Sequence, residues 1–340
     1  MKSHTWQFDR HGDPADVMHW REQELPEPGP GQALVRIRSV GLNNSDMNYV
    51  SGQYFPPEEF PTCQGQEAVG DVLALGSELQ GKPLRDDEIK VGSRIAFLPM
   101  LVDTQSMGVF RDVGLYSQSA LVPVPEGFSD AEGAAYWEGI ITMVGALDMA
   151  GAGPDSVEGK TLLVTAGASG MGVIALKLAR AWGMRTIATT RNTRKAKGLE
   201  DICDAVVVSE TPEKIVEGVH AVTDGRGADV ILDPVGDDYF PALIECAASS
   251  GSIVSYESMT GSSASLPILQ MMLKDLSIHG FTVHRTMNNP ELLDRLIAIG
   301  LEYADVARPI IAGHYRMSDA PEALVELRKA RHLGKLILEA

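Results

Sequence analysis

Short stretches in the first third of the chain alternate between apolar and polar residues. Residues 33–40, Ala-Leu-Val-Arg-Ile-Arg-Ser-Val, alternate cleanly. Similar runs occupy residues 68–75, 94–97 and 119–124. A period of two predicts strands with one buried face, and the prolines and glycines of residues 26–31 and 56–57 indicate turns between such strands. A helical period is hard to find up to about residue 125, so we expect a mainly antiparallel, partly barrel-like β domain.

After Pro125 the pattern changes to strands that alternate with helices. Residues 161–166 are a fully apolar strand, and the helical period that follows over residues 171–182 ends at Gly183. Further strands are expected at residues 185–190, 205–208, 228–233, 252–256 and 276–281. Helices are expected at residues 129–135, 139–150, 193–199, 213–223 and 239–248. Six strands with intervening helices predict a doubly wound parallel sheet of the α/β class, the Rossmann arrangement.

A chain of 340 residues suggests two domains, at roughly 150 residues each. From Pro290 onward a helix, a strand and a helix follow the parallel sheet, and we expect them to return to the first domain. Residues 1–127 and 288–340 should therefore form one split catalytic domain, and residues 128–287 the dinucleotide-binding domain.

Charge and cysteine usage narrow the partners and the compartment. With 29 Lys and Arg against 46 Asp and Glu, the net charge is −17, which argues against nucleic acid or an anionic membrane surface as a partner. No run of 18 apolar residues is present, and the first 20 residues lack the apolar segment of a signal peptide. Cys63, Cys203 and Cys246 are widely spaced and form no Cys-x-x-Cys pair. We expect idle thiols in a cytoplasmic protein that acts on a small molecule.

A glycine-rich segment lies between the first strand of the alternating region and its helix. It reads Ala-Gly-Ala-Ser-Gly-Met-Gly over residues 166–172, close to the G-x-G-x-x-G pattern that brings a backbone turn and a helix N-terminus against a pyrophosphate. The strand before it and the helix after it favour dinucleotide binding over a purely structural turn. The residues expected to bind the cofactor here are Gly167, Ser169, Gly170, Met171 and Gly172.

The end of the next strand indicates which dinucleotide binds. An NAD-binding enzyme has an acidic residue at this place for the ribose hydroxyl, but residues 189–195 read Thr-Thr-Arg-Asn-Thr-Arg-Lys. Arg191 could clamp a 2′-phosphate, with Arg194 and Lys195 adding charge and Thr190 at the strand end. The alternative is a solvated basic helix start, although positive charge there is unfavourable without an anion. We therefore predict NADPH.

Several further segments carry a family resemblance. They are residues 26–32, 41–46, 51–54, 65–70, 114–116, 233–236 and 334–335. Together with the glycine-rich segment they resemble the medium-chain dehydrogenase/reductase superfamily, in its zinc-free quinone oxidoreductase branch, over nearly the whole chain. The resemblance implies a GroES-like fold for the catalytic domain and a homodimer.

The resemblance also bears on metal binding. Zinc-dependent members carry a Cys and a His at the places where this chain has Asn43 and Gln66, and amides are poor zinc ligands. The four clustered cysteines of a structural zinc lobe are missing, and the eight histidines never pair at ligand spacing. We therefore assign no metal ligand.

The resemblance implies that Asn43, Asp46 and Tyr54 line the nicotinamide pocket. Asn43 and Asp46 would orient the carboxamide or the substrate, and Tyr54 would bind the acceptor oxygen or supply a proton. The alternatives are that Asn43 and Asp46 cap a helix starting near Ser45 and that Tyr54 is a core residue. Further cofactor-binding candidates are Thr142, Tyr256, Phe281 and Lys335, of which Tyr256 and Phe281 are as easily packing residues. Residues 100–110 are either an apolar lid or a long loop.

The function predicted from these residues is hydride transfer from NADPH to a quinone or to the C=C bond of an α,β-unsaturated carbonyl. Two alternatives stay open, a 2-enoyl-thioester reductase and a non-catalytic NADPH-binding regulator.

Overall fold

The computed structural model describes residues 1–77, 83–84 and 87–340. Its chain forms two compact units, unit 1 with residues Met1–Glu138 and Pro309–Ala340, and unit 2 with residues Gly139–Arg308. The division falls later in the chain than the boundaries expected after residues 127 and 287. The second difference arises because helix α12 (Pro290–Glu302) packs within unit 2. There Arg295 pairs with Asp148 at 2.8 Å, and the ring of Tyr303 meets that of Trp182 edge to face.

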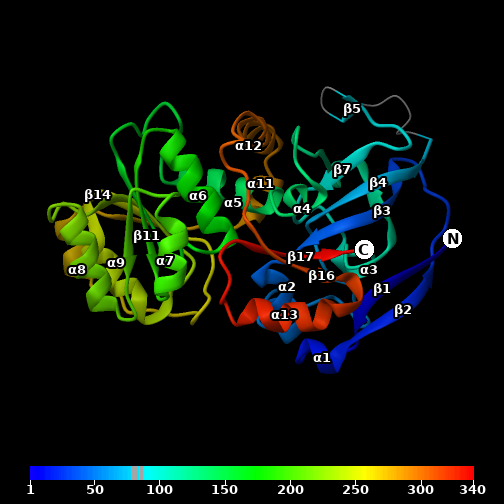
Figure 1. Cartoon of the computed structure of the whole chain (residues 1–340), viewed down its shortest axis with the longest axis horizontal. Coiled ribbons are helices and arrows are strands. Elements are labelled where there is room, and N and C mark those ends of the chain that lie inside the picture. The colour runs from blue at the N-terminus through cyan, green and yellow to red at the C-terminus, as the bar shows by residue number, and fades with distance from the viewer. Residues whose placement is uncertain (78–82, 85–86) are drawn as a thin grey trace. The chain divides into compact units, whose positions relative to one another are not determined.

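Unit 1 is built on a largely antiparallel sheet. Its strands are β3 (Gln32–Gly41), β4 (Ala68–Leu75), β7 (Arg94–Phe97), β8 (Val113–Ser117), β9 (Leu121–Pro123), β16 (Ile311–Arg316) and β17 (Lys335–Glu339). The order is β16-β17-β3-β4-β7-β9, with β8 paired to β3 and only β16–β17 parallel among these pairs. Figure 1 shows red β17 beside blue β3, so the two segments of the unit share one sheet. This confirms the predicted β domain.

Five short helices also belong to unit 1. They are α1 (Pro14–Val17), α2 (Asn44–Ser51), α3 (Thr104–Met107), α4 (Asp130–Gly133) and α13 (Ala320–Arg328). Residues 100–110 contain α3, and Val109 and Phe110 are fully buried in the core of the unit. These two residues therefore belong to the core, and an apolar lid formed by the rest of the segment stays a prediction.

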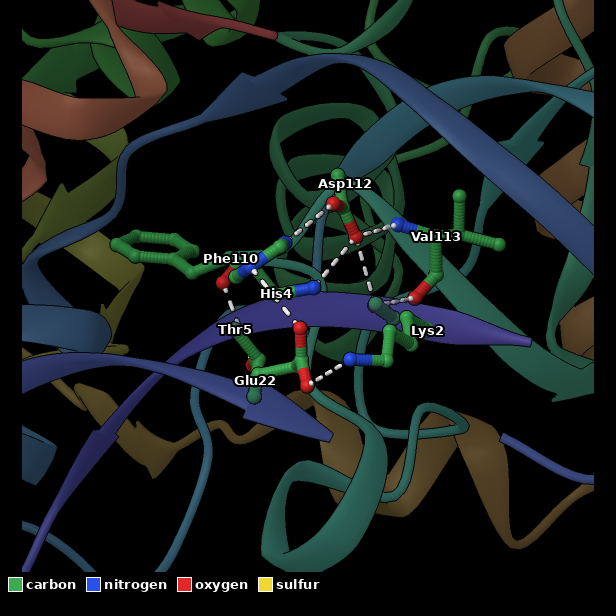
Figure 2. A network of polar contacts seen from close by, with 8 residues as sticks. Lys2, His4, Thr5, Glu22, Phe110, Asp112 and Val113 are labelled. Atoms are coloured by element: carbon green, nitrogen blue, oxygen red, sulfur yellow. Dashed lines mark hydrogen bonds and ion pairs between the residues drawn. The ribbon is translucent and has the colours of Figure 1, made fainter. Parts of the chain in front are cut away.

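A hairpin of β1 (Lys2–Phe8) and β2 (Met18–Glu24) precedes the sheet, and no sequence pattern predicted it. Asp112 holds it in place, because its Oδ1 accepts hydrogen bonds from the His4 N–H at 2.8 Å and the Ser3 hydroxyl at 2.7 Å. Figure 2 shows this contact together with the Lys2–Glu22 ion pair that joins the two strands. Two shorter strands, β5 (Pro83–Leu84) and β6 (Asp87–Glu88), pair with each other.

Unit 2 contains a parallel sheet with a buried apolar interior. Its strands are β10 (Thr161–Val164), β11 (Arg185–Thr190), β12 (Ala205–Val208), β13 (Ala228–Asp233), β14 (Ala247–Ser255) and β15 (Ser277–Gly280). The order is β12-β11-β10-β13-β14-β15 and every pairing is parallel. The predicted six-stranded Rossmann sheet is confirmed.

The helices of unit 2 are α5 (Trp137–Met149, which begins in unit 1), α6 (Gly170–Ala181), α7 (Thr193–Leu199), α8 (Pro212–Val222), α9 (Phe240–Cys246), α10 (Ile268–Leu273), α11 (Val283–Met287) and α12. The helix expected over residues 239–248 ends at Cys246, because Ala247 already pairs with Ala228 at the start of β14. No described helix is long and apolar enough to cross a membrane.

Candidate active site

Three side chains from distant parts of unit 1 form a buried polar cluster. The ammonium of Lys335 donates to Glu67 Oε2 at 2.5 Å and to Asn43 Oδ1 at 2.6 Å. Asn43 Nδ2 in turn donates to Glu67 Oε2 at 3.2 Å, and Glu67 Oε1 accepts the backbone N–H of Glu138 at 2.9 Å. Lys335 is 5% exposed and Glu67 is fully buried. Burying an ion pair out of contact with water costs free energy, and hydrogen bonds to its other polar atoms offset part of that cost. Asn43 and the Glu138 N–H supply such hydrogen bonds here.

The cluster forms where adjacent strands β17, β3 and β4 bring their ends together. Lys335 is the first residue of β17, Glu67 precedes β4, and Asn43 follows β3 by two residues. Gly41, the last residue of β3, makes room for this arrangement. A Cβ atom there would lie 2.0 Å from the carbonyl oxygen of Ala134 and 2.9 Å from Glu67 Oε2. A side chain at this position would push the Glu67 carboxylate out of place.

Asp46 extends the cluster into α2. Its Oδ2 accepts the backbone N–H of Asn43 at 2.9 Å. Asn43 is the N-cap of α2 and Asp46 is in the first turn, so this contact is the capping-box hydrogen bond from the helix back to its N-cap. Burial raises the pKa of Asp46 to about 7, although the Asn43 N–H and the Lys335 charge act in the opposite direction. The capping role that the sequence left open for Asp46 is therefore present, on a carboxyl group that titrates near neutrality.

The pH dependence of stability should reveal this carboxyl group. Asp46 is ionised above pH 3.8 in the unfolded chain but only above about pH 7 in the folded one, so folding binds a proton in between and this contribution to stability falls as the pH rises. We expect the free energy of unfolding of the wild type to fall relative to Asp46→Asn by about 1.4 kcal/mol per pH unit within this window. Urea unfolding at pH 5, 6 and 8 measures it. Asp103→Asn, at the exposed cap of α3, is the control, and identical profiles for wild type and Asp46→Asn would contradict the expectation.

Glu67 was missed by the sequence reading, and Lys335 was predicted to bind cofactor. Glu67 stands in the Gly65-Gln66-Glu67 motif, in which the sequence pointed only to Gln66, at the place of a zinc-binding histidine. The structure shows the Lys335 ammonium engaged by Glu67 and Asn43, so its contact with a cofactor stays a prediction. No local sequence pattern joins Glu67 to Lys335, because the two residues are 268 positions apart.

Tyr54 lies away from this cluster. It follows the C-terminal end of α2, whereas Asn43 precedes the N-terminal end, and an eight-residue helix is roughly 12 Å long. Tyr54 is 38% exposed, and its ring meets the Phe55 ring edge to face with 4.8 Å between the centroids. Tyr54 is therefore no core residue, and its contact with substrate stays a prediction.

In unit 2, the glycine-rich segment forms the predicted turn between β10 and α6. A Cβ atom on Gly172 would lie 2.8 Å from Gly167 Cα, and one on Gly167 would lie 2.7 Å from Ala188 Cβ. Ser169 caps α6, since its Oγ accepts the N–H of Gly172 at 3.1 Å. Gly167 and Gly172 therefore approach as closely as the fingerprint demands. Gly170 and Met171 begin α6, and their contact with a cofactor stays a prediction.

The end of β11 presents the predicted basic residues. Thr190 is buried at the strand end, and Arg191 and Arg194 are exposed. Lys195 is half-buried, and both burial and the charge of Arg191 lower its pKa. Two neighbouring cations form a suitable place for a phosphate. Binding of a 2′-phosphate by these residues stays a prediction.

The remaining cofactor candidates occupy different environments. Thr142 is buried on α5, and Phe281 is buried against Gly145 of the same helix, where a Cβ atom would lie 2.6 Å from the Phe281 ring. Tyr256 follows β14 and is half-buried, and no described atom accepts a hydrogen bond from its hydroxyl. Burial raises the pKa of Tyr256 well above its usual value. Phe281 thus serves as a packing residue in unit 2. Contact of Thr142, Tyr256 and Phe281 with a cofactor stays a prediction.

Comparison with known proteins places the chain in a family. The alcohol dehydrogenase GroES-like domain matches residues 29–126 and the zinc-binding dehydrogenase domain matches residues 170–298. Quinone oxidoreductase of Pseudomonas aeruginosa is 29% identical over 346 aligned residues, with 98% of each chain covered. The crystal structure of Pseudomonas syringae pv. tomato quinone oxidoreductase matches with a TM-score of 0.83 at 26% identity, covering 99% of this chain and 100% of that one. The chain belongs to the medium-chain dehydrogenase/reductase superfamily, in its quinone oxidoreductase-like branch.

Other similar proteins carry different activities in their names. Prostaglandin reductase-3 of Mus musculus is 28% identical over 340 residues, covering 94% of this chain and 84% of the relative. The structure of Escherichia coli quinone oxidoreductase complexed with NADPH matches with a TM-score of 0.84 at 23% identity, covering 99% of this chain and 100% of that one. The fold class and superfamily predicted from the sequence are thereby confirmed.

The residues of this member do not fit the zinc ion that its second domain family is named for. Asn43 has both side-chain polar atoms engaged by Lys335 and Glu67, and Gln66 Oε1 accepts the backbone N–H of Met100 at 2.5 Å. Neither amide is a good zinc ligand. Among the residues described, no three His, Cys, Asp or Glu side chains gather as a metal site.

Proposed function

We propose that this protein is a zinc-independent, NADPH-dependent oxidoreductase that delivers hydride to a quinone or to the C=C bond of an α,β-unsaturated carbonyl. The observation that carries the proposal is the Asn43–Glu67–Lys335 cluster of the GroES-like domain, in which the amide of Asn43 stands where the resemblance places a zinc ligand. Without a Lewis acid to polarise a simple carbonyl, the suitable acceptors are those already activated by conjugation. The names of the quinone oxidoreductase and prostaglandin reductase relatives support this class.

NADPH is the cofactor that the residues of unit 2 fit. The turn of residues 166–172 and the N-terminus of α6 would hold the pyrophosphate, and Arg191 and Lys195 would hold the 2′-phosphate. Bound there, NADPH supplies the hydride, that is, both electrons of the reduction. Two neighbouring structures are described as NADPH complexes, which supports the same cofactor.

The chain itself must supply orientation and a proton. The acceptor gains negative charge as hydride arrives, and a proton from an acid or from water completes the reduction. Tyr54, an exposed residue that follows α2, is our candidate donor. We propose that Asn43 and Asp46 help to form the substrate pocket. The hydrogen bonds of Asn43 to Lys335 and Glu67, and of Asp46 to the Asn43 backbone, would fix their positions there.

The test is a steady-state assay with 1,4-benzoquinone, cyclohex-2-enone and crotonyl-CoA, each with NADPH or NADH and with or without EDTA. Turnover of the quinone or the enone with NADPH, unchanged by EDTA, is the expected result. Turnover of the thioester alone would replace the proposal by the enoyl-thioester reductase, which the acryloyl-coenzyme A reductase relative also suggests. Tight NADPH binding without turnover would favour the non-catalytic regulator.

Tyr54→Phe is expected to lower kcat roughly 100-fold, because a general acid contributes at least about that factor, while NADPH binding stays unchanged. The substitution keeps the ring and its contact with Phe55. Single-turnover reduction of the preferred acceptor and a separate NADPH titration measure the two effects. Tyr315→Phe on β16 is the matched control. A Tyr54→Phe enzyme with the kcat of the wild type would remove Tyr54 from the mechanism.

We also propose a homodimer formed through the edge of the unit 2 sheet. β15 pairs only with β14 among the described strands, and the neighbouring α10 exposes Leu269, Met272 and Leu273 by 67–77%. An open strand edge beside exposed apolar side chains is typical of an interface. Leu273→Glu is expected to convert the dimer to a monomer in light scattering. Val306→Glu, at another exposed apolar residue, should leave the mass unchanged, and a dimeric Leu273→Glu protein would contradict this interface.

The cytoplasm is the compartment we propose. All three cysteines are free thiols, which suits a reducing environment.

A further inference from the structure

One buried aspartate, Asp233, connects the ends of three neighbouring strands in unit 2 through its carboxylate and its backbone carbonyl. β10 and β13 are adjacent, although β11 and β12 lie between them in the chain, so the strand order reverses at this place. Thr165 directly follows β10, and Asp233 is the last residue of β13. The backbone carbonyl of Asp233 also accepts the N–H of Tyr256 at 3.1 Å, just beyond β14.

The carboxylate of Asp233 is held by hydrogen bonds rather than by a cation. The Thr165 hydroxyl donates to Asp233 Oδ1 at 2.5 Å, the Val235 N–H donates to Oδ1 at 3.2 Å, and the Gly236 N–H donates to Oδ2 at 3.0 Å. Asp233 is fully buried and Thr165 is 2% exposed. Burial raises the pKa of Asp233 against the opposing effect of these donors. Such a group is costly to bury unless hydrogen bonds satisfy it, and a buried group that is satisfied in this way holds its partners rigidly.

Each of these hydrogen bonds ends on a turn that the backbone adopts only under constraint. Ala166, next to Thr165, has a left-handed φ of 48°, and the following Gly167 N–H donates to Thr189 O at 3.0 Å. On the other side, Gly236 has φ 72° and ψ −155°, a conformation open to glycine alone. Its neighbours in turn bind the loop after β14, where the N–H of Met259 donates to Pro234 O at 2.9 Å.

We propose that Asp233 is a positioning residue for the cofactor, which fixes the glycine-rich turn through the Thr165 hydroxyl and the turn of residues 234–236 through two backbone N–H groups. The two turns flank the place where the strand order reverses, and open α/β sheets bind their ligands there. The inference rests on the proposed NADPH-dependent function. It assigns to Asp233 and Thr165 no contact with cofactor or substrate.

The chain offers a matched control for the test. Thr186 is fully buried near the amino end of β11, and its hydroxyl donates to Asp204 Oδ2 at 2.9 Å. The Thr186–Asp204 contact therefore repeats the threonine–aspartate chemistry of Thr165–Asp233 at the opposite end of the strands. Thr165→Val and Thr186→Val each remove one hydroxyl from such a pair at nearly constant volume.

We expect Thr165→Val to raise the Kd and the KM for NADPH about tenfold, because small errors in the geometry of a binding site weaken it strongly. The kcat at saturating NADPH should stay within about twofold of the wild type. Thr165→Ser, which keeps the hydroxyl, should bind like the wild type, and Thr186→Val should change the melting temperature without changing the Kd. Asp233→Asn, which leaves one acceptor oxygen, should weaken binding at least as much as Thr165→Val.

Fluorescence titration with NADPH and melting curves on the same preparations distinguish the outcomes. Equal NADPH affinity in wild type, Thr165→Val and Asp233→Asn would overturn the positioning role and leave the proposed function intact. Equal weakening by Thr165→Val and Thr186→Val would also overturn it, because the effect would then follow general sheet stability. A wild-type protein that does not bind NADPH would overturn the proposed function and this inference together.

Discussion

Replacing Lys335 by methionine is expected to lower the free energy of unfolding by about 3–5 kcal/mol. The substitution leaves the fully buried Glu67 carboxylate without the ammonium that now lies 2.5 Å from its Oε2. Asn43 would lose the donor to its Oδ1 as well. An uncompensated buried charge is among the few single changes with an effect of this size.

The double variant Glu67→Gln/Lys335→Met identifies the cause. It removes both charges together. The amide introduced at position 67 can still accept the Glu138 N–H, and it can donate to Asn43 Oδ1 once the Asn43 amide turns over. We expect the double variant to be more stable than Lys335→Met alone, so that the two losses are far from additive. Urea unfolding of the wild type, both single variants and the double variant completes the cycle. Losses that add, or a Lys335→Met protein within about 1 kcal/mol of the wild type, would show that the pair is not the buried ion pair described.

Arg191→Ala is expected to weaken NADPH binding by about 1.5–3 kcal/mol, or roughly 10- to 150-fold in Kd, which is the contribution of a charge-assisted hydrogen bond. Binding of NADH, which lacks the 2′-phosphate, should not change. The preference for NADPH over NADH should therefore fall by the same factor. The reason is local, since Arg191 and Lys195 lie close enough for the charge of Arg191 to lower the pKa of Lys195.

Lys197→Ala provides the comparison for this prediction. Lys197 is exposed on α7, the helix that begins two residues after Arg191, and has the same charge, but the sequence assigns it no role at the phosphate. Titration of both variants with NADPH and with NADH, at one ionic strength, separates a specific contact from the general field of the basic segment. Equal effects of the two substitutions, or an unchanged NADPH Kd in Arg191→Ala, would contradict the 2′-phosphate assignment.

The parallel sheet of unit 2 was predictable because its information is local. A fully apolar strand between glycines and a helix of period 3.6 leave few alternatives, and α7 begins and ends at the residues expected, next to the capping Asn192. The glycine-rich turn followed for the same reason, since its constraint is the close approach of Gly167 and Gly172 within one short segment.

The missing parts depend on residues far apart in the chain. The β1–β2 hairpin contains few apolar residues in sequence, and it becomes part of the core only through contacts such as Trp6 N–H to Phe110 O at 2.9 Å. Helix α12 has an apolar face, but its sequence does not indicate which of the two units this face packs against. The partnership of Glu67 with Lys335 has no local pattern at all, and the sequence could give only the amides that replace zinc ligands.

The separation of Glu67 from Lys335 along the chain also determines the order in which the two units can fold during synthesis. The two residues are 268 positions apart, and all of unit 2 is made between them. At elongation rates of roughly 5–20 residues per second, roughly 15–50 s pass between the addition of Glu67 and the addition of Lys335, whose ammonium pairs with the Glu67 carboxylate. Unit 2 is one continuous segment and can complete its sheet in that interval. The arrival of β17 then closes the cluster, so a nascent chain stalled before this strand carries a finished unit 2 and an unfinished unit 1.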